Sequence, residues 1–145
     1  MTDLIIDVLR LNGLLMTAGD RMVARFGLTS TRWQVLGAIA DAERAQPVAW
    51  LARDMGGNRQ NVQRIVNDLQ KMGLVTLEVN PHHRRASLVV LTDKGRWTYE
   101  EAGRLQAPRA NGLAEDLAIK DIDITRRVVA QLQKKLELNG ERASI

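Results

Sequence analysis

The stretch VAWLARDMGGNRQNVQRIVNDLQKMG, residues 48–73, contains two helical patterns separated by a glycine turn. The first pattern runs from Val48 to Met55, and Gly56-Gly57 breaks it. Asn58 is placed to cap a second, longer helix, because an asparagine side chain accepts hydrogen bonds from the first free backbone amides of a helix. Two helices joined by a tight glycine turn predict a helix-turn-helix.

The two faces of the second helix differ in chemistry. Its predicted inner face is apolar and consists of Val62, Ile65, Val66 and Leu69. Its start and outer face carry amides and arginines, namely Asn58, Arg59, Gln60, Asn61, Gln63 and Arg64. Arginine matches the acceptors of guanine, and asparagine or glutamine matches the donor and acceptor of adenine. We therefore predict that these six residues bind DNA, and an ordinary solvated helix face is the alternative.

After Gly73 the apolar period changes from helical to alternating. Val75, Leu77 and Val79 predict one short strand, and Ser87 to Leu91 predicts another. The turn between these strands is polar and basic, with the sequence Asn80-Pro81-His82-His83-Arg84-Arg85. Arginines at an exposed hairpin tip can contact phosphates or enter a narrow minor groove. The order helix, turn, helix, hairpin predicts a winged helix-turn-helix and weakens the alternative of a solvated face.

Helices are predicted on both sides of this segment. From Leu4 to Phe26 the apolar stripe is wider than a lone domain of this size needs, so part of it is expected to pack on a second subunit. Thr29, Ser30 and Thr31 are candidate caps of the following helix, whose buried face is predicted to be Trp33, Leu36, Ile39 and Ala40.

The C-terminal third is predicted to hold two more helices. Thr92 is expected to cap a helix that runs to about Gln106, where Pro108 should kink or interrupt the chain. Ile122 to Leu138 has the pattern of a last amphipathic helix, and the tail from Asn139 to Ile145 is predicted to be loose.

In order and spacing, residues Leu28 to Gly95 resemble the MarR-type (multiple antibiotic resistance) family of regulators. The likeness is carried by four segments: LTSTRWQVL at 28–36, LARDMG at 51–56, VQRIVNDLQKMGLV at 62–75 and RRASLVVLTDKG at 84–95. Each segment alone is weakly specific, whereas their combination is fairly specific.

The resemblance implies a mainly α fold with a two-stranded β-wing and a single domain over residues 1–145. In that arrangement residues 28–95 form the DNA-binding lobe, residues 92–107 form a connecting helix, and residues 1–26 and 109–145 are dimerisation helices. It also implies a homodimeric transcriptional regulator, expected to be a repressor of a pseudo-palindromic operator with half-sites about 10 base pairs apart. Arg64 and its neighbours would enter the major groove and Arg85 the minor groove. A small aromatic or phenolic effector is the further partner that the resemblance suggests.

Three positions depart from the family pattern. His83 stands where such proteins usually carry an aspartate that orients the wing arginine, so the wing is expected to be less rigid. His82 and His83 are predicted as further wing contacts that gain charge near pH ~6.5, and solvated histidines without a role are the alternative. Asn58 and Asn61 replace the more usual serine and threonine. Trp50 replaces a polar residue and is expected to be partly buried, with a ligand-lining role as the weaker alternative.

Composition excludes several other functions. The 145-residue chain is 45% hydrophobic and has no cysteine, so it can form one packed domain but no disulfide or thiolate site. No stretch approaches the roughly 18 apolar residues of a membrane span. Its start, Met1-Thr2-Asp3-Leu4, lacks the basic flank of a signal peptide. We therefore predict a soluble, cytoplasmic protein with no membrane partner.

The sequence contains no arrangement typical of an enzyme. Ser30, Ser87 and Ser144 fall in cap, strand and tail contexts, and the only two histidines are neighbours in the hairpin. No glycine-rich phosphate loop follows a strand, and His82-His83 with Glu78 is too sparse a set for zinc. We predict no catalytic residue, no metal site and no cofactor.

The charge pattern fits an anionic partner. The chain has 21 basic and 17 acidic residues and a net charge of +4, and its middle third carries Arg59, Arg64, Arg84 and Arg85 with few acids nearby. Double-stranded DNA is the partner that this pattern predicts. Two alternatives remain open at this point: a protein that coats chromosomal DNA without a preferred site, and an adaptor whose winged helix binds protein.

Overall fold

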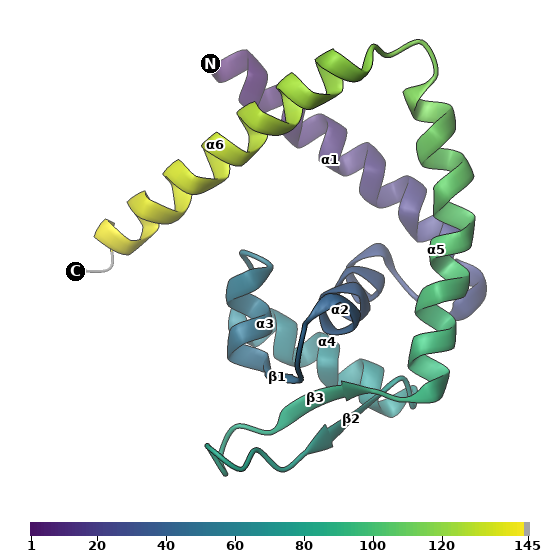
Figure 1. Cartoon of the computed structure of the whole chain (residues 1–145), viewed down its shortest axis with the longest axis vertical. Helices are drawn as coiled ribbons and strands as arrows, with labels where there is room; N and C mark the ends of the chain where they lie inside the picture. The colour runs from purple at the N-terminus through teal and green to yellow at the C-terminus, as the bar shows by residue number, and fades with distance from the viewer. Residues whose placement is uncertain (144–145) are drawn as a thin grey trace. The chain divides into compact units, whose positions relative to one another are not determined.

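The computed structural model describes residues 1–143, with side chains up to residue 139. Its elements follow in the order α1 (Thr2–Val23), η1 (Ala24–Phe26), α2 (Ser30–Asp41), β1 (Gln46–Pro47), α3 (Val48–Asp54), α4 (Arg59–Lys71), β2 (Val75–Glu78), β3 (Leu88–Leu91), α5 (Asp93–Ala114) and α6 (Ile119–Ala143). Figure 1 labels the α-helices and the strands. The residues divide into two compact units, Met1–Ala107 and the residues from Pro108 onward.

The winged helix-turn-helix lies in the N-terminal unit. Its core is built from side chains of every long element of that unit, including Val23 of α1, Leu36 of α2, Leu51 of α3, Leu69 of α4 and Ala102 of α5. The predicted inner face of α4 is confirmed, because Val62, Ile65, Val66 and Leu69 are all buried. The mainly α fold with a β-wing is therefore confirmed.

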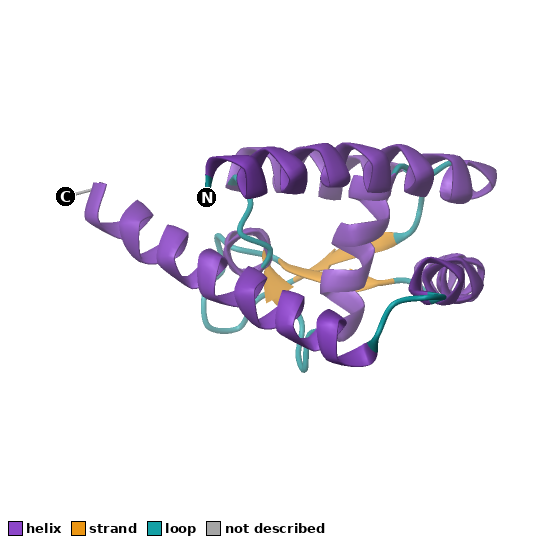
Figure 2. Ribbon diagram, turned by 90° about the horizontal axis from the view of Figure 1, so that it is seen from above, coloured by secondary structure: helices purple, strands orange, loops and turns teal. Residues whose placement is uncertain are grey.

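The sheet has three strands where two were predicted. It is antiparallel with the order β1-β3-β2, and Figure 2 shows the strands in orange among the helices. Glu78 of β2 and Pro47 of β1 both pair with Leu88 of β3, and Val75 pairs with Leu91. The additional strand, β1, has only two residues, which is too short to produce an alternating pattern in the sequence.

The predicted helix caps are confirmed. The Thr29 side chain accepts a hydrogen bond from the backbone amide of Arg32 at 3.2 Å, and Thr92 Oγ1 accepts one from the amide of Gly95 at 3.0 Å. Gly27 follows η1 and Gly73 follows the end of α4, and their φ angles are 69° and 72°. That left-handed region is accessible to glycine at little cost, so both helices stop where the chain must turn.

The C-terminal helices differ from the sequence prediction. The expected interruption at Pro108 is wrong, because α5 continues through Pro108 to Ala114. A proline removes one hydrogen bond of the helix, and this stretch of α5 is exposed, so the freed carbonyl of Arg104 is open to solvent. The tail predicted to be loose from Asn139 is helical up to Ala143, as the last part of α6. Ser144 and Ile145 lie outside the described residues.

None of the helices within residues 1–143 is long and apolar enough to cross a membrane.

Candidate nucleic-acid interface

The turn between α3 and α4 has the geometry of a helix-turn-helix. Gly56 has a φ of 63°, which a residue with a side chain rarely adopts. The Gly57 amide donates a hydrogen bond to the carbonyl oxygen of Ala52 at 2.8 Å. Asn58 then caps α4, because its Oδ1 accepts hydrogen bonds from the amides of Gln60 at 2.8 Å and Asn61 at 3.2 Å. The capping role predicted for Asn58 is confirmed, and the side chain is occupied by it.

The outer face of α4 presents its polar side chains to solvent. Arg59, Gln60, Asn61 and Arg64 are exposed, and Gln63 is half-buried. Arg64 Nη2 donates a hydrogen bond to Asn61 Oδ1 at 2.8 Å, and Gln63 Nε2 donates one to Asn67 Oδ1 at 2.9 Å. Asn67 is exposed on the same helix. The sequence prediction did not include it on the outer face of α4, although its position four residues after Gln63 places the two side chains on one face.

An ion pair fixes α4 against α2. Arg32 Nη2 lies 3.0 Å from Asp68 Oδ2, and their side chains are 31% and 28% exposed. Because these side chains are partly shielded from water, the pair holds α4 more firmly than a fully exposed pair would. Asp68 is the only acidic residue of α4, so this ion pair leaves the helix without an unpaired carboxylate.

Hydrogen bonds of the Asn80 side chain organise the wing loop. The sequence predicted Asn80 as part of the turn but predicted no role for its side chain. Asn80 is only 7% exposed. Its Nδ2 donates to the carbonyl oxygen of Ala86 at 3.1 Å, and its Oδ1 accepts from the amides of His82 at 3.0 Å and His83 at 3.3 Å. The loop is thus closed by side-chain hydrogen bonds across its base. The expectation that His83 makes the wing less rigid stays a prediction.

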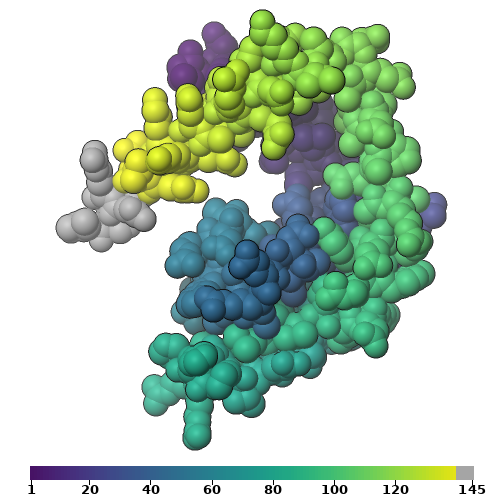
Figure 3. Space-filling model, viewed as in Figure 1, coloured from purple at the N-terminus to yellow at the C-terminus, as the bar shows by residue number. Residues whose placement is uncertain are grey.

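The side chains of the basic wing residues have no hydrogen-bond or ion-pair partner among the side chains that the structure describes. His82, His83, Arg84 and Arg85 are all exposed, and in Figure 3 the teal wing loop projects from the lobe. Neither arginine makes a side-chain hydrogen bond or ion pair within residues 1–143. Two arginines without internal partners on a projecting loop are available to phosphates or to a groove.

The end of α4 is connected to the start of α5 by a set of close contacts. Thr92 Oγ1 donates to the carbonyl oxygen of Gly73 at 2.7 Å, the Thr92 amide donates to that of Leu74 at 3.1 Å, and Lys94 Nζ donates to that of Met72 at 2.9 Å. Gly95 lies so close to Leu74 that an added Cβ would overlap its carbonyl oxygen. The orientation of α4 is therefore tied to the first turn of α5.

An aromatic contact connects α2 and α5 within the same unit. The rings of Trp33 and Tyr99 lie 6.3 Å apart, and Trp33 Nε1 is buried without a hydrogen-bond partner among the described residues. Burial raises the pKa of the Tyr99 hydroxyl, and the charge of Asp41 and the hydrogen bond to that carboxylate raise it further. The neutral hydroxyl is the form that this packing stabilises.

Trp50 is partly exposed. Its surface is 43% accessible to solvent and its ring lies against the guanidinium groups of Arg44 and Arg53, which agrees with the predicted partial burial. Trp50 does not join the core, because α3 buries Val48, Leu51 and Ala52 and Trp50 lies on the opposite side of this short helix.

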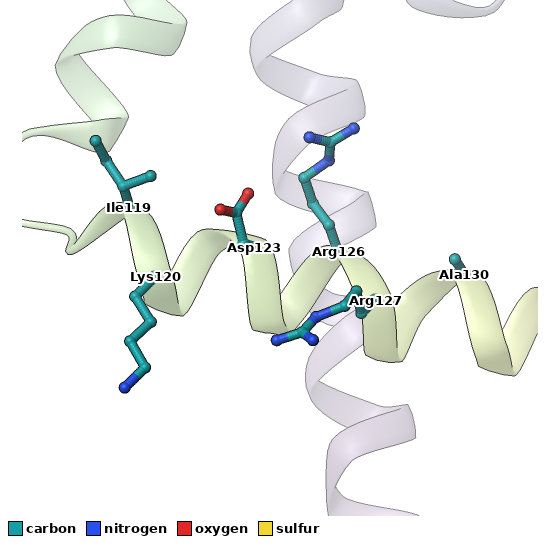
Figure 4. Close-up of a pocket in the computed structure, with 6 residues that line it drawn as sticks. All are labelled: Ile119, Lys120, Asp123, Arg126, Arg127 and Ala130. Carbon is teal, nitrogen blue, oxygen red and sulfur yellow. The ribbon is translucent and has the colours of Figure 1, made fainter.

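A hollow of about 770 Å³ runs along α6 and is lined by residues of that helix alone. In Figure 4 Asp123 and Arg126 extend to one side of the helix, and Lys120 and Arg127 extend to the other. Since these polar side chains diverge, they form no binding constellation. Nor do residues 1–143 contain a group of three or more histidine, aspartate or glutamate side chains that could hold a metal ion.

The helix-turn-helix of α3 and α4, the three-stranded sheet and the projecting basic loop together define a winged helix-turn-helix protein. A family model described as the MarR family matches residues 26–86. A transcriptional activatory protein, BadR, of Rhodopseudomonas palustris is 30% identical over 110 residues, which are 74% of this chain and 63% of that protein. An uncharacterised protein of Mycobacterium tuberculosis is 47% identical over 93 residues, which are 64% of each chain. The chain thus spans less than two thirds of these relatives.

Solved structures agree with the assignment. The transcriptional repressor CouR bound to a DNA duplex has a TM-score of 0.78 and 27% identity, covering 88% of this chain and 89% of CouR. A MarR/EmrR family transcriptional regulator from Acinetobacter has a TM-score of 0.84 and 20% identity, covering 94% of this chain and 96% of that chain. Residues 26–86 therefore match the MarR family, and the fold of this chain is similar to that of MarR-family transcriptional regulators.

Proposed function

We propose that this protein is a sequence-specific, double-stranded-DNA-binding transcriptional regulator that acts as a homodimer. The observation that carries the proposal is the outer face of α4, where the Arg64 guanidinium is held by Asn61 at 2.8 Å beside exposed Arg59 and Gln60. A guanidinium held in place by a neighbour loses less conformational freedom when it binds a base edge. CouR, a repressor of similar fold, is bound to a 23-mer DNA duplex, which supports the same partner here.

The two parts of the interface have different roles in this proposal. Arg59, Gln60, Asn61, Gln63 and Arg64 read base edges in the major groove, with Arg64 as the principal contact to guanine. Asn58 holds the helix start, and its oxygen is already occupied by backbone amides. Arg84 and Arg85 contact the backbone or minor groove, and His82 and His83 add phosphate contacts at the wing.

Exposed apolar side chains support the homodimer. Along α1 eight large apolar residues are at least 40% exposed, namely Leu4, Ile5, Ile6, Val8, Leu9, Leu11, Leu14 and Leu15. On α6 the exposed apolar residues include Ile124, Val128, Val129, Leu136 and Leu138. Surfaces of this kind are rarely left in contact with water in a soluble protein. We assign residues 1–26 and 109–145 to dimerisation, residues 28–95 to the DNA-binding lobe and residues 92–107 to the connection between them.

Repression and release by an effector complete the proposal. CouR is named a repressor and its structure has been solved with p-coumaroyl-CoA, whereas BadR is named an activatory protein. We assign repression to this chain, with a small aromatic or phenolic molecule as the effector. Such an effector changes DNA affinity only to the extent that it binds the DNA-free conformation more tightly than the DNA-bound one.

The test is selection of bound duplexes from a random pool at about 150 mM salt, which damps non-specific attraction to phosphates. The expected result is a two-fold-symmetric motif with half-sites about 10 base pairs apart. Mass measurement should give a particle of twice 16.2 kDa. Binding without enrichment of any motif would favour a chromosome-coating protein, and absence of binding would favour a protein-binding adaptor.

A further inference from the structure

An exposed tryptophan between two arginines lies on the first helix of the helix-turn-helix. The Cζ atom of Arg44 lies 5.9 Å from the centre of the Trp50 ring, and that of Arg53 lies 5.6 Å from it. We call Arg44, Trp50 and Arg53 the Trp50 patch. The Arg53 side chain is 72% exposed and Arg44 is exposed as well. A ring face attracts cations, so Trp50 gathers two guanidinium groups that would otherwise repel each other.

The acidic groups beside the patch leave its charge largely available. Asp54 Oδ1 lies 3.6 Å from Arg53 Nε, which is a long ion pair between exposed groups. Asp54 Oδ2 accepts a hydrogen bond from Gln46 Nε2 at 3.1 Å, so Gln46 shares this carboxylate with Arg53. Asp41 and Glu43 are the other nearby acids in the sequence, and among the described side chains no carboxylate pairs with Arg44.

The patch adjoins both parts of the proposed DNA interface. It is followed along the chain by the Gly56-Gly57 turn and α4. Pro47, the residue before α3, pairs with Leu88, the first residue of β3 after the wing loop. The start of α3 therefore lies at the end of the sheet from which the wing loop emerges. In helix-turn-helix proteins the first helix crosses the DNA backbone while the second enters the major groove.

We infer that the Trp50 patch binds phosphates of the DNA backbone and extends the footprint beyond α4 and the wing. Each guanidinium offers a planar fork of donors that matches a phosphate. Trp50 positions the two forks by stacking, and it carries no base preference itself. The inference rests on the proposed function, because it assigns further contacts to the same DNA partner.

The test compares Arg44→Gln/Arg53→Gln with a charge-matched control, Arg96→Gln/Arg104→Gln, which removes two exposed arginines of α5. Binding of each protein to its selected duplex and to random duplex is measured over a range of salt concentrations. We expect the patch variant to bind both duplexes about tenfold more weakly, with the preference between them unchanged. Its plot of log affinity against log salt should be shallower by about 0.9 for every phosphate that the variant no longer neutralises. The control should keep the wild-type slope.

Two further readouts separate the patch from a general defect. The midpoint temperature of thermal unfolding should be the same in the patch variant and the wild type, because the two substituted side chains are exposed. Ethylation of phosphates outside the α4 site should interfere with binding of the wild type but not of the variant. Trp50→Phe should bind as the wild type does, whereas Trp50→Ala should weaken binding, since phenylalanine retains a ring face.

Wild-type affinity and salt slope in the double arginine variant would overturn the inference and leave the proposed function intact. That result would reassign the patch to an acidic segment of a protein partner. Equal weakening by Trp50→Phe and Trp50→Ala would also overturn the stacking role. If the wild-type protein bound no duplex at all, the proposed function itself would fail.

Discussion

Arg64 and Asn61 are joined by a hydrogen bond of 2.8 Å on the exposed face of α4, one turn apart along the helix. The bond fixes the direction of a long side chain that would otherwise sample many rotamers in water. We therefore propose that base recognition depends on the pair, because Asn61 sets where the guanidinium of Arg64 points.

Arg64→Ala should weaken binding to the selected duplex by about 1 to 3 kcal/mol and relax base preference at one position of each half-site. Asn61→Ala should have a smaller effect at the same position, since the arginine is present but no longer oriented. Fluorescence anisotropy with single-base variants of the duplex measures both effects. Equal weakening on every sequence would contradict a base-reading role for Arg64.

Arg85→Ala should weaken binding to all sequences by a similar factor, because a phosphate or minor-groove contact carries little base information. The slope of log affinity against log salt should also become shallower by about 0.9 if the variant neutralises one phosphate fewer per duplex. Arg96→Ala removes an exposed arginine from α5 and serves as the charge control. A change in base preference with Arg85→Ala would assign the wing a reading role instead.

Asn80→Ala should destabilise the wing, since it removes the buried side chain that bonds Ala86, His82 and His83. The expected cost is about 1 to 3 kcal/mol, the usual effect of leaving buried partners unsatisfied. Asn80→Asp keeps the acceptor for the two amides but removes the donor to Ala86, so its cost should differ from that of alanine. Urea unfolding gives the stabilities, and amide exchange of residues 80–86 locates the effect. Unchanged exchange in Asn80→Ala would contradict this role.

Gly95→Ala should destabilise the fold by about 1 to 3 kcal/mol, because its Cβ would overlap the carbonyl oxygen of Leu74 and force α5 away from the end of α4. Gly103→Ala is the matched control on the same helix, where an added Cβ meets nothing within 4 Å. That substitution should stabilise α5 by roughly 0.5 to 1 kcal/mol, since alanine is the better helix former. If both variants had equal stability, the close approach at Gly95 would not be a structural constraint.

Tyr99 should make the protein sensitive to alkaline pH. Its pKa is raised above 10.0 in the folded state by burial and then by Asp41, so the native state holds this proton more tightly than the unfolded state. The resulting stabilisation is fully present below the unfolded pKa near 10 and is lost as pH rises through the folded pKa. Urea unfolding between about pH 9 and 11 should show a steeper decline in stability for the wild type than for Tyr99→Phe. Parallel curves would contradict the assignment.

The α4 helix and the wing could be predicted from the sequence because their signals are local. Asn58 precedes a helix whose apolar residues recur at the helical period, and the change to an alternating period after Gly73 predicts strands. These patterns were sufficient to identify Arg59, Gln60 and Arg64 as outward residues. The order of the segments then indicated the family.

Contacts between distant residues could not be obtained in the same way. Arg32 and Asp68 are 36 residues apart, and nothing in either local sequence identifies the other as its partner. Trp50 was expected to be partly buried, but nothing in the local sequence identifies Arg44, six residues earlier, as a neighbour of its ring. Pro108 is tolerated within α5 because that stretch is exposed, which the sequence around the proline does not reveal.

By itself, the sequence determined which segments form helices and strands and which side chains point outward, since periodicity, caps and turns act over a few residues. The tertiary structure alone decided how those side chains are held: Asn80 closes the wing, and Gly95 ties α5 to the end of α4. Such contacts depend on the path of the whole chain, because packing and hydrogen bonding join residues that no local pattern relates.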